Sequence, residues 1–472
     1  MRLFYPLTLQ LTAAYNKTVR MKGGIAMNNP QKYIISLDSM THAQKAKTLL
    51  AVNGYSAEVA RAPGSCGFGV SVYGKKGRTE CSACRRRAEN KGDQGTLRER
   101  PVNFDNAATS FPKPPQVIAA ATNAMTRYGG NPSRGGHRLA MAASAAVYEV
   151  REAAAKMFGG TPENTVFTYN CTHALNYAIK GVMRPGDHIV ISSLEHNSVS
   201  RPAAALGRRG CEMSVFTVYP DDERTLRSLA AAVTPKTRVV ACTAASNVTG
   251  QLLPISRIGS FCRENGICLI VDGAQACGIV PLSLSGDNIN ILCTAGHKAL
   301  YGLTGTGLLL SDGKYEIAPF IEGGTGSDSG NILQPDYLPD SLEAGTLNTI
   351  GILSLGAGMR FIASRSMTKL RAREESLCGS FIDGLERLGA VIYREKGAKY
   401  VPVVSFNLKG VSPGALAERL SERGFCLRSG LHCAGLAHKT LNTGDGTVRF
   451  APSVFNNEQE VARLLTEIKN FL

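Results

Sequence analysis

The chain has 472 residues, a formal net charge of +16 and 43% hydrophobic residues. Its length predicts two or three domains, and no apolar run in it is long enough to cross a bilayer. Much of the positive excess lies in the first hundred residues, where 85–87 are all Arg, and no nucleic-acid-binding motif accompanies it. We therefore expect neither a membrane nor a nucleic-acid partner and interpret the basic stretch as a solvated linker.

Cysteine usage points to a reducing compartment. Thirteen cysteines in a chain of this length are too dilute for a disulfide scaffold, so we expect a cytoplasmic protein. Cys81 and Cys84 form a CxxC, but no second pair follows that could complete a zinc site. We interpret this pair as incidental and expect no metal.

Residues 1–30 predict a leader, either untranslated or without a fold of its own. Polar residues and a proline interrupt its apolar stretch, which makes a poor signal peptide, whereas its basic, acid-free composition leaves a mitochondrial presequence open. A third interpretation starts from Lys22-Gly23-Gly24, which a purine-rich ribosome-binding sequence can encode. On that interpretation the true start is Met27.

The next segments predict a small domain and a linker. Residues 31–75 alternate strand and helix patterns, with a helical stretch that stops at Gly54, and indicate a small βαβ-type domain. Residues 76–101 are basic and polar, which is typical of a linker.

From residue 102 to about 350 the pattern predicts a large α/β domain. Helical stretches at 114–128 and 137–158 end at Gly159, and short Val/Ile/Leu-rich strands then alternate with helices. Such strands indicate a mostly parallel sheet covered on both faces. Residues 351–472 have longer helices and few strands, so we expect a smaller α+β domain there.

Reactive residues follow five of the predicted strands. In open α/β sheets ligands bind at the carboxyl ends of the strands, so these residues should converge on one crevice. Each alone has an ordinary structural explanation as a cap, a turn or a solvated charge. Together they suit pyridoxal phosphate (PLP), which needs a lysine, a carboxylate, a stacking face and phosphate donors. The strand-end residues are Asn170–Thr172, Glu195–Asn197, Ser246 with Asn247, Asp272, and Gly296–Lys298.

These motifs resemble a known family. "VDGAQACG" followed by "AGHKALYGLTGTG" is similar to the cofactor segment of class V aminotransferase-fold enzymes, the cysteine desulfurases and selenocysteine lyases. "NFDNAATSFPKP", "SSLEHNSVSRP", "EAGTLNT" and "RSGLHCAGLAHKTLNTGDGTVRF" extend the resemblance in family order from residue 102 to the end. The resemblance implies a fold type I PLP-dependent transferase.

The resemblance implies roles for the cofactor-binding residues. Lys298 would bind the cofactor's aldehyde, and Asp272 would pair with its pyridine nitrogen. Gln275 would contact the ring hydroxyl, and His196 would stack on the ring and assist catalysis. The phosphate ligands would be Thr172, His297 and, from the second subunit of a homodimer, Thr346.

The remaining implied roles concern the substrate. Asn247, which would also adjoin the cofactor, and Arg449 would hold the substrate carboxylate, with support from Arg428. Lys298 would move the Cα proton of L-cysteine. Cys433, activated by neighbours such as His432 and His196, would attack the substrate sulfur, leaving a Cys433 persulfide and releasing alanine.

Two departures from the family pattern bear on these roles. Ala295 stands where relatives often carry Ser or Thr, which removes one phosphate contact that Thr294 could replace. Ala451 and Val454 stand where polar or aromatic residues are common in the branch that the chain most resembles, which bears on substrate preference.

The front segment resembles a small family of sulfur or selenium carrier proteins through "YIISLDSMTHAQKAKTLLAVNGYSAEV" and "GSCGFGVSVYG". The sulfur acceptor would then be either a separate protein or this segment, with Cys66 as a relay; a purely packing role is the alternative. A selenocysteine lyase, another PLP-dependent enzyme of the same fold, and a non-catalytic carrier remain alternative functions.

Overall fold

The computed structural model describes residues 101–472 except 133–136 and 328–329, together with three strands and Lys47 of the first hundred residues. The chain divides into two compact units, residues 1–100 with 412–415, and residues 101–411 with 416–472. Met27, Cys66 and the CxxC of Cys81 and Cys84 lie outside the described residues, as do the expected leader and nearly all of the linker.

The N-terminal unit contains a three-stranded sheet in the order β1–β3–β2. Its strands are β1 (Lys32–Leu37), β2 (Tyr55–Arg61) and β3 (Phe68–Lys75). β3 is antiparallel to both neighbours, so β1 and β2 run parallel to each other on either side of it. This is the strand arrangement of a split βαβ unit, and Lys47 between β1 and β2 is helical.

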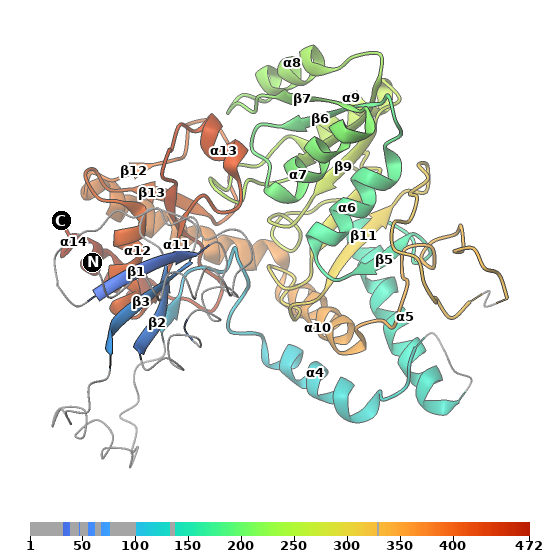
Figure 1. Ribbon diagram of the computed structural model, residues 1–472, viewed down its shortest axis with the longest axis horizontal. Helices are drawn as coiled ribbons and strands as arrows, with labels where there is room; N and C mark the ends of the chain where they lie inside the picture. Colours follow the sequence, from blue (N-terminus) through green and yellow to red (C-terminus); the bar gives the residue numbers. More distant parts are fainter. Residues whose placement is uncertain are drawn as a thin grey trace. The chain divides into compact units, whose positions relative to one another are not determined.

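The second unit is built on a seven-stranded sheet in the order β5–β11–β10–β9–β8–β6–β7 (Figure 1). Only β11 runs antiparallel to its neighbours, so the predicted mostly parallel sheet is confirmed. Most of its strands are buried along their whole length, as their Val/Ile/Leu-rich sequences predict. The strands are β5 (Thr165–Thr168), β6 (His188–Ser192), β7 (Glu212–Phe216), β8 (Thr237–Thr243), β9 (Cys268–Asp272), β10 (Ile291–Ala295) and β11 (Gly307–Ser311).

Helices cover both faces of this sheet. One hydrophobic core joins the sheet to α6 (Cys171–Val182) and α7 (Asn197–Ala205), and the other joins it to helices on the opposite face. That second layer contains α4 (Pro115–Arg127), α5 (Arg138–Phe158), α9 (Ile255–Glu264) and α10 (Thr349–Arg365). The predicted stop of α5 is its C-cap Gly159, whose φ of 67° suits glycine. α8 (Asp222–Ala232) packs beside β7, and the 3-10 turn η1 (Leu206–Arg209) follows α7.

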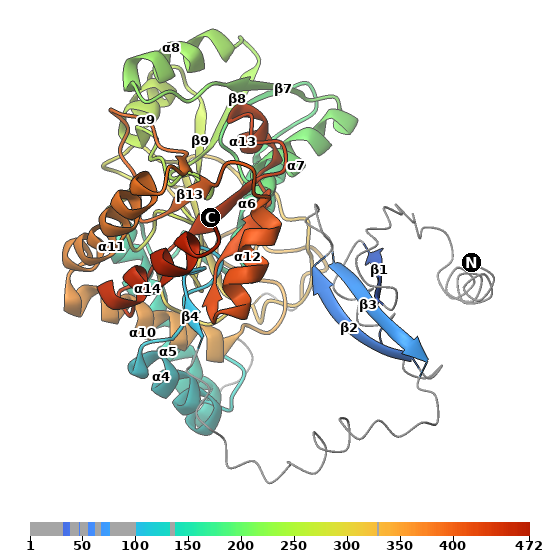
Figure 2. The same cartoon turned by 90° about the vertical axis from the view of Figure 1, so that its left-hand side faces the viewer.

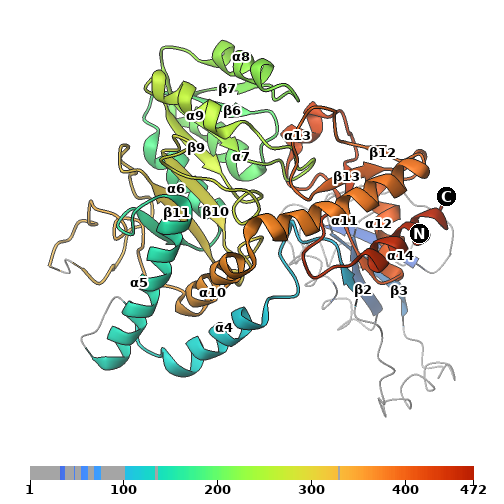
Figure 3. The ribbon, with the colours of Figure 1, turned by 180° about the vertical axis from the view of Figure 1, so that it is seen from behind.

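The chain leaves the large domain through a sharp break between two long helices. α10 packs on α4 and α5, Ser366 then adopts a φ of 68°, and α11 (Met367–Arg387) continues into the small domain (Figure 3). The predicted division between 350 and 351 therefore falls beside the start of α10. We retain 102–350 and 351–472 as a proposed division.

The small domain has a four-stranded antiparallel sheet in the order β12–β13–β16–β15. Its own core includes residues of α11, α12 and α14, which Figure 2 shows grouped together. The elements are β12 (Val391–Ile392), β13 (Val404–Asn407), α12 (Pro413–Glu422), β15 (Arg428–Gly430), α13 (Gly435–Thr440), β16 (Thr447–Phe450) and α14 (Glu458–Lys469).

The first described residues of this unit join its two domains. β4 (Val102–Asn103) pairs with β14 (Phe425–Cys426) of the small domain, and Asp105 bridges to Ala451. The chain then crosses to the large domain and enters α4. No helix in the described ranges is long and apolar enough to span a membrane.

Candidate active site

Residues from all five predicted strand ends meet in one cavity of about 220 Å³ between the large and small domains. Four of the predicted strand-end residues are not in its lining, namely Glu195, Asn197, Ser246 and Gly296. Its walls come from the carboxyl ends of β8, β9 and β10, the start of α6 and α7, and the β15–β16 region. Of the described residues predicted for the site, Thr346 and Cys433 are not in its lining. Those that line it are Thr172, His196, Asn247, Asp272, Gln275, His297, Lys298, Arg428 and Arg449.

Asp272 ends β9 and presents one carboxylate oxygen to the cavity. Its Oδ1 accepts hydrogen bonds from the backbone N–H of Ala274 at 2.9 Å and from the thiol of Cys171 at 3.3 Å. Burial raises the pKa of Cys171 well above its usual range, with a contribution from Asp272, so the thiol remains a donor. Within the described residues Oδ2 has no hydrogen-bond partner, which leaves it available for a cationic ring nitrogen.

Lys298 lies three residues after β10, is half-buried, and lines the same cavity as this carboxylate. Burial lowers the pKa of Lys298, and the negative charge of Asp272 opposes that shift. Desolvation of this kind increases the fraction of neutral amine, which is the nucleophilic and proton-accepting form. The position is therefore suited to a lysine that both binds an aldehyde and moves a proton.

His196 is a neutral histidine fixed by the start of α7. Its Nδ1 accepts a hydrogen bond from the backbone N–H of Ser198 at 3.0 Å, which places the ring hydrogen on Nε2. Burial lowers the pKa of His196 to about 4, despite the opposing charge of Asp272. A neutral flat ring in this wall suits stacking on an aromatic cofactor.

Hydroxyl groups gather at the N-terminus of α6. Asn170 caps this helix by accepting a hydrogen bond from the backbone of His173, and Thr172 lies in its first turn. The hydroxyls of Thr172 and Ser198 are 2.6 Å apart, and both residues line the cavity. Ser198 was not predicted from the sequence, although it stands two residues after His196 in the family motif. Hydroxyls and free backbone N–H groups at a helix N-terminus suit an anion, so this position is a candidate phosphate site.

Thr294 does not replace the hydroxyl missing at Ala295. Its Oγ1 donates to the carbonyl of Gly273 at 3.4 Å, and the residue does not line the cavity, so that expectation was wrong. Thr346 lies elsewhere in its own chain, where its hydroxyl accepts a hydrogen bond from Asn131 at 3.1 Å. A contribution of Thr346 to a partner's site stays a prediction.

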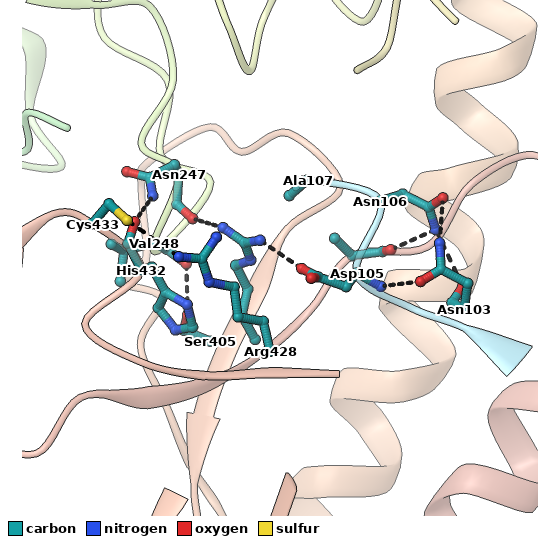
Figure 4. A network of polar contacts seen from close by, with 12 residues as sticks. Asn103, Asp105, Asn106, Ala107, Asn247, Val248, Ser405, Arg428, His432 and Cys433 are labelled. Atoms are coloured by element: carbon teal, nitrogen blue, oxygen red, sulfur yellow. Dashed lines mark hydrogen bonds and ion pairs between the residues drawn. The ribbon is translucent and has the colours of Figure 1, made fainter. Parts of the chain in front are cut away.

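Arg449 is the largest fully buried side chain of the described residues. Its Nη1 donates to the carbonyl of Asn247 at 2.9 Å, and its Nη2 donates to Asp105 at 2.7 Å. Asn247 Nδ2 in turn donates to the carbonyl of His432 at 2.8 Å (Figure 4). Across the cavity, Gln275 donates to the carbonyl of Ala107 at 2.9 Å. Asp105, too, was not predicted from the sequence.

Cys433 lies at the mouth of the site, in the turn between β15 and α13. Its side chain is exposed, and Nη2 of Arg428 lies 3.2 Å from its sulfur (Figure 4). His432 and Cys433 have φ values of 47° and 56°, which strain non-glycine residues and turn the thiol outward. The backbone N–H of Asn197 donates to the Cys433 carbonyl at 2.8 Å and holds this turn beside His196.

The predicted activation of Cys433 by His432 does not match this geometry. Nε2 of His432 lies 3.0 Å from the hydroxyl of Thr447, and burial lowers the pKa of His432 well below its usual range. A neutral ring held in the core is not an ion-pair partner for a thiolate. The guanidinium of Arg428 takes the place that we expected for His432.

Known proteins resemble this chain over most of its length. The model of the family described as aminotransferase class V matches residues 102–464. The chain belongs to this family. A protein of Pyrococcus abyssi named "Probable cysteine desulfurase" is 32% identical over 382 residues, 78% of this chain and 94% of that protein. A cysteine desulfurase of Salmonella agona is 30% identical over 387 residues, 79% of this chain and 94% of that protein.

A solved structure agrees with these relatives. The apo structure of a cysteine desulfurase from Thermococcus onnurineus NA1 superposes with a TM-score of 0.73 at 29% identity. The match covers 79% of this chain and 94% of that chain. The class V aminotransferase family is PLP-dependent, and this chain is an enzyme of that kind.

The described residues fit PLP. The cavity combines the amine of Lys298, a carboxylate oxygen of Asp272 that has no partner in the described part of the chain, and the hydroxyls at the start of α6. Four more lining residues bury a polar atom that has no hydrogen-bond partner among the described residues. These atoms are Asn247 Oδ1, His297 Nδ1, His432 Nδ1 and Arg449 Nε. Such atoms favour a polar ligand, because a buried polar group without a partner is costly.

Proposed function

We propose that this enzyme is a cysteine desulfurase, which converts L-cysteine to L-alanine and leaves the sulfur on Cys433 as a persulfide. The observation that carries the proposal is the pairing of Cys433 with Arg428, which lines the same cavity as Lys298 and Asp272. An aminotransferase needs the lysine and the carboxylate but has no use for an exposed thiol there.

The cofactor, when bound, supplies an electron sink for the bonds at the Cα of the substrate. The residues of the chain supply the rest. Asp272 would hold the pyridine nitrogen protonated, Gln275 would contact the ring hydroxyl, and Thr172, Ser198 and His297 would bind the phosphate. Arg449 and Asn247 would orient the substrate carboxylate, Arg449 through its fixed donor fork.

In the proposed reaction the Cα proton of the substrate moves to Lys298, and the sulfur of the substrate moves to Cys433. Nζ of Lys298 would accept the Cα proton, for which a neutral amine is required. Sγ of Cys433, as a thiolate beside Arg428, would attack the substrate sulfur. The S–S bond forms as the Cβ–S bond breaks, and the released electron pair would be protonated at Cβ. Lys298 would then return a proton to Cα to give alanine.

The proposal is tested by supplying purified enzyme, PLP and L-cysteine and measuring alanine. With a reductant present, alanine and sulfide should appear in equal amounts, and neither should appear with Lys298→Ala. Wild-type protein that binds no PLP, or that binds it and forms no alanine, would contradict the proposal. Selenocysteine turnover measured in parallel distinguishes a selenocysteine lyase.

We also propose that the enzyme is a homodimer in which Thr346 contributes to the partner's phosphate site. Residues 318–348 carry exposed apolar side chains, with Ile332 99% and Leu333 72% exposed, which a second copy would cover. Light scattering should give twice the mass of one chain, and Thr346→Ala should weaken PLP binding. A monomer that binds PLP fully would contradict this proposal.

The sulfur acceptor is proposed to be either a separate protein or Cys66 of the same chain. A tether between two domains raises their effective concentration to the millimolar range, which supports transfer within one molecule. Persulfide mapping by mass spectrometry after incubation with cysteine tests the relay. Label on Cys66 that disappears in Cys433→Ser supports it, whereas unlabelled Cys66 with unchanged turnover of Cys66→Ser contradicts it.

We propose a cytoplasmic location. The ten cysteines that the structure describes all carry free thiols, and seven of them are buried in the large-domain or small-domain cores. This usage is typical of a reducing compartment. Fractionation of cells that express the native message, with mass determination of the N-terminus, tests both the location and Met27 as the start.

A further inference from the structure

One backbone carbonyl beside the predicted catalytic lysine receives an unusual number of donors. The oxygen of His297, the residue before Lys298, accepts from the backbone N–H and the hydroxyl of Ser110 at 3.1 and 3.2 Å. It also accepts from the hydroxyl of Thr109 at 3.1 Å and from Nζ of Lys113 at 3.0 Å. A carbonyl oxygen has two lone pairs, so four donors are twice its usual capacity.

Lys113 is the charged member of this group. Burial lowers its pKa to about 8, so the ammonium keeps its proton at neutral pH. Its hydrogen bonds go to the carbonyl of His297 and, at 2.8 Å, to the hydroxyl of Ser110. In the described part of the chain it forms no ion pair with a carboxylate. This cation is therefore directed at a backbone oxygen rather than at an opposite charge.

The same short segment contacts the other side of the cavity. Asp105 binds Arg449 at 2.7 Å, and the carbonyl of Ala107 accepts a hydrogen bond from Gln275 at 2.9 Å. Figure 4 shows Asp105 and Ala107 on the segment that follows β4 and enters the polar network of the site. Residues 105–113 thus connect the predicted substrate-carboxylate ligand to the peptide that carries Lys298.

We propose that Lys113 is a positioning residue for Lys298: its ammonium fixes the His297 carbonyl and so the backbone from which Lys298 reaches the substrate. Thr109 and Ser110 share this task through weaker, neutral hydrogen bonds. The effect on turnover rests on the proposed function, in which Lys298 moves the Cα proton. A displacement of about 1 Å in such a group can slow a reaction by up to about a hundredfold.

The test compares Lys113→Gln, which removes the charge, with Lys113→Arg, which keeps it. Lys236→Gln is the matched control, because Lys236 is an exposed lysine paired with Glu212 away from the cavity. We expect Lys113→Gln to lower kcat about 10- to 100-fold with KM for cysteine changed less than about twofold. The Cα-deuterium isotope effect on kcat should rise, Lys113→Arg should recover most of the loss, and Lys236→Gln should match wild type.

A second readout requires no turnover. Full-length enzyme freed of cofactor is mixed with PLP, and borohydride added at successive times traps the cofactor on Lys298, which peptide mass identifies. Lys113→Gln should slow this covalent step, while the final extent of labelling equals that of wild type. Thr109→Val should slow it less, and this variant tests the same contact if Lys113→Gln does not fold.

The outcomes separate this proposal from the proposed function. If wild type forms no alanine but Lys113→Gln slows trapping on Lys298, the desulfurase assignment fails and the positioning role stands. If Lys113→Gln matches wild type in trapping rate and in isotope effect, the positioning role is overturned. It is also overturned if Gln and Arg variants lose activity equally and in proportion to a lowered melting temperature, because that pattern reports stability alone.

Discussion

Nη2 of Arg428 lies 3.2 Å from Sγ of Cys433, at the mouth of a cavity whose base holds Lys298 and Asp272. The contact joins a cation that the sequence assigned to substrate binding with the thiol that it assigned to sulfur transfer. A guanidinium at this distance stabilises negative charge on sulfur, which is the reactive form of cysteine. Arg428 therefore contacts the proposed nucleophile as well as lining the cavity.

The first prediction concerns this contact. Arg428→Met should slow alkylation of Cys433 by iodoacetamide at pH 7 about tenfold, because a charge-assisted hydrogen bond of about 1.5 kcal/mol is lost. The alkylation rate of Arg428→Lys should lie between those of wild type and Arg428→Met. Alkylation is followed by mass spectrometry of the Cys433 peptide. Equal rates in all three proteins would show that the contact does not activate the thiol.

The second prediction concerns Asp105 and Arg449. Asp105→Asn keeps the size of the side chain but leaves the buried guanidinium without its carboxylate, so Arg449 should be held less firmly. KM for cysteine should rise about tenfold, equivalent to about 1.4 kcal/mol, with a smaller change in kcat. Asp187→Asn, which weakens an ion pair with Arg238 away from the cavity, is the control. An unchanged KM would remove Asp105 from this role.

The third prediction concerns Ser198. Its hydroxyl is 2.6 Å from that of Thr172 at the start of α6, so both should contact one phosphate. Ser198→Ala should raise the Kd for PLP about tenfold, as expected for the loss of one hydrogen bond to a charged group. Ser260→Ala on α9 is the control. Fluorescence titration with PLP measures this Kd. The same Kd in Ser198→Ala as in wild type would exclude Ser198 from the phosphate site.

The fourth prediction concerns pH and stability. Burial raises the pKa of Glu374 from its ordinary 4.5 to about 8, and Tyr301 donates a long 3.5 Å hydrogen bond to it. In this interval the folded protein holds a proton that the unfolded chain has lost, so its stability falls as pH rises from about 4.5 to 8. Glu374→Gln stays neutral, so its stability should fall much less over this pH range.

Melting temperatures measured from pH 5 to pH 8 test this expectation. The matched control is Glu375→Gln, because Glu375 is the exposed neighbour paired with Arg371. The control should keep the wild-type slope of melting temperature against pH. A slope that is the same in Glu374→Gln as in wild type would show that Glu374 is not the titrating group.

The sequence predicted those site residues that lie at the carboxyl ends of strands. Asp272 ends β9 and Lys298 follows β10, and the apolar sequences of both strands mark them as buried and parallel. Parallel strands end at one edge of a sheet. That rule alone is enough to place both residues in one cavity. It could not predict the reversed direction of β11, because an apolar strand reads alike in parallel and antiparallel pairing.

Contacts between segments that lie far apart in the chain could not be predicted from the sequence either. Asp105 and Arg449 are 344 residues apart, and no local pattern links a carboxylate just after β4 to an arginine in β16. The partner of Cys433 was missed for a different reason. The positive φ values of His432 and Cys433 turn the thiol toward Arg428 and the imidazole toward Thr447, and neighbouring positions in a sequence do not reveal such a turn.

Mass spectrometry of the full-length enzyme after brief incubation with L-cysteine tests the central claim most directly. The peptide that contains Cys433 should gain one sulfur atom, and a reductant should remove it as sulfide. Cys433→Ser should keep the visible absorbance of bound PLP yet gain no sulfur and release no sulfide. Sulfide release by Cys433→Ser near the wild-type rate, or wild-type protein whose Cys433 stays unmodified while alanine accumulates, would contradict the account.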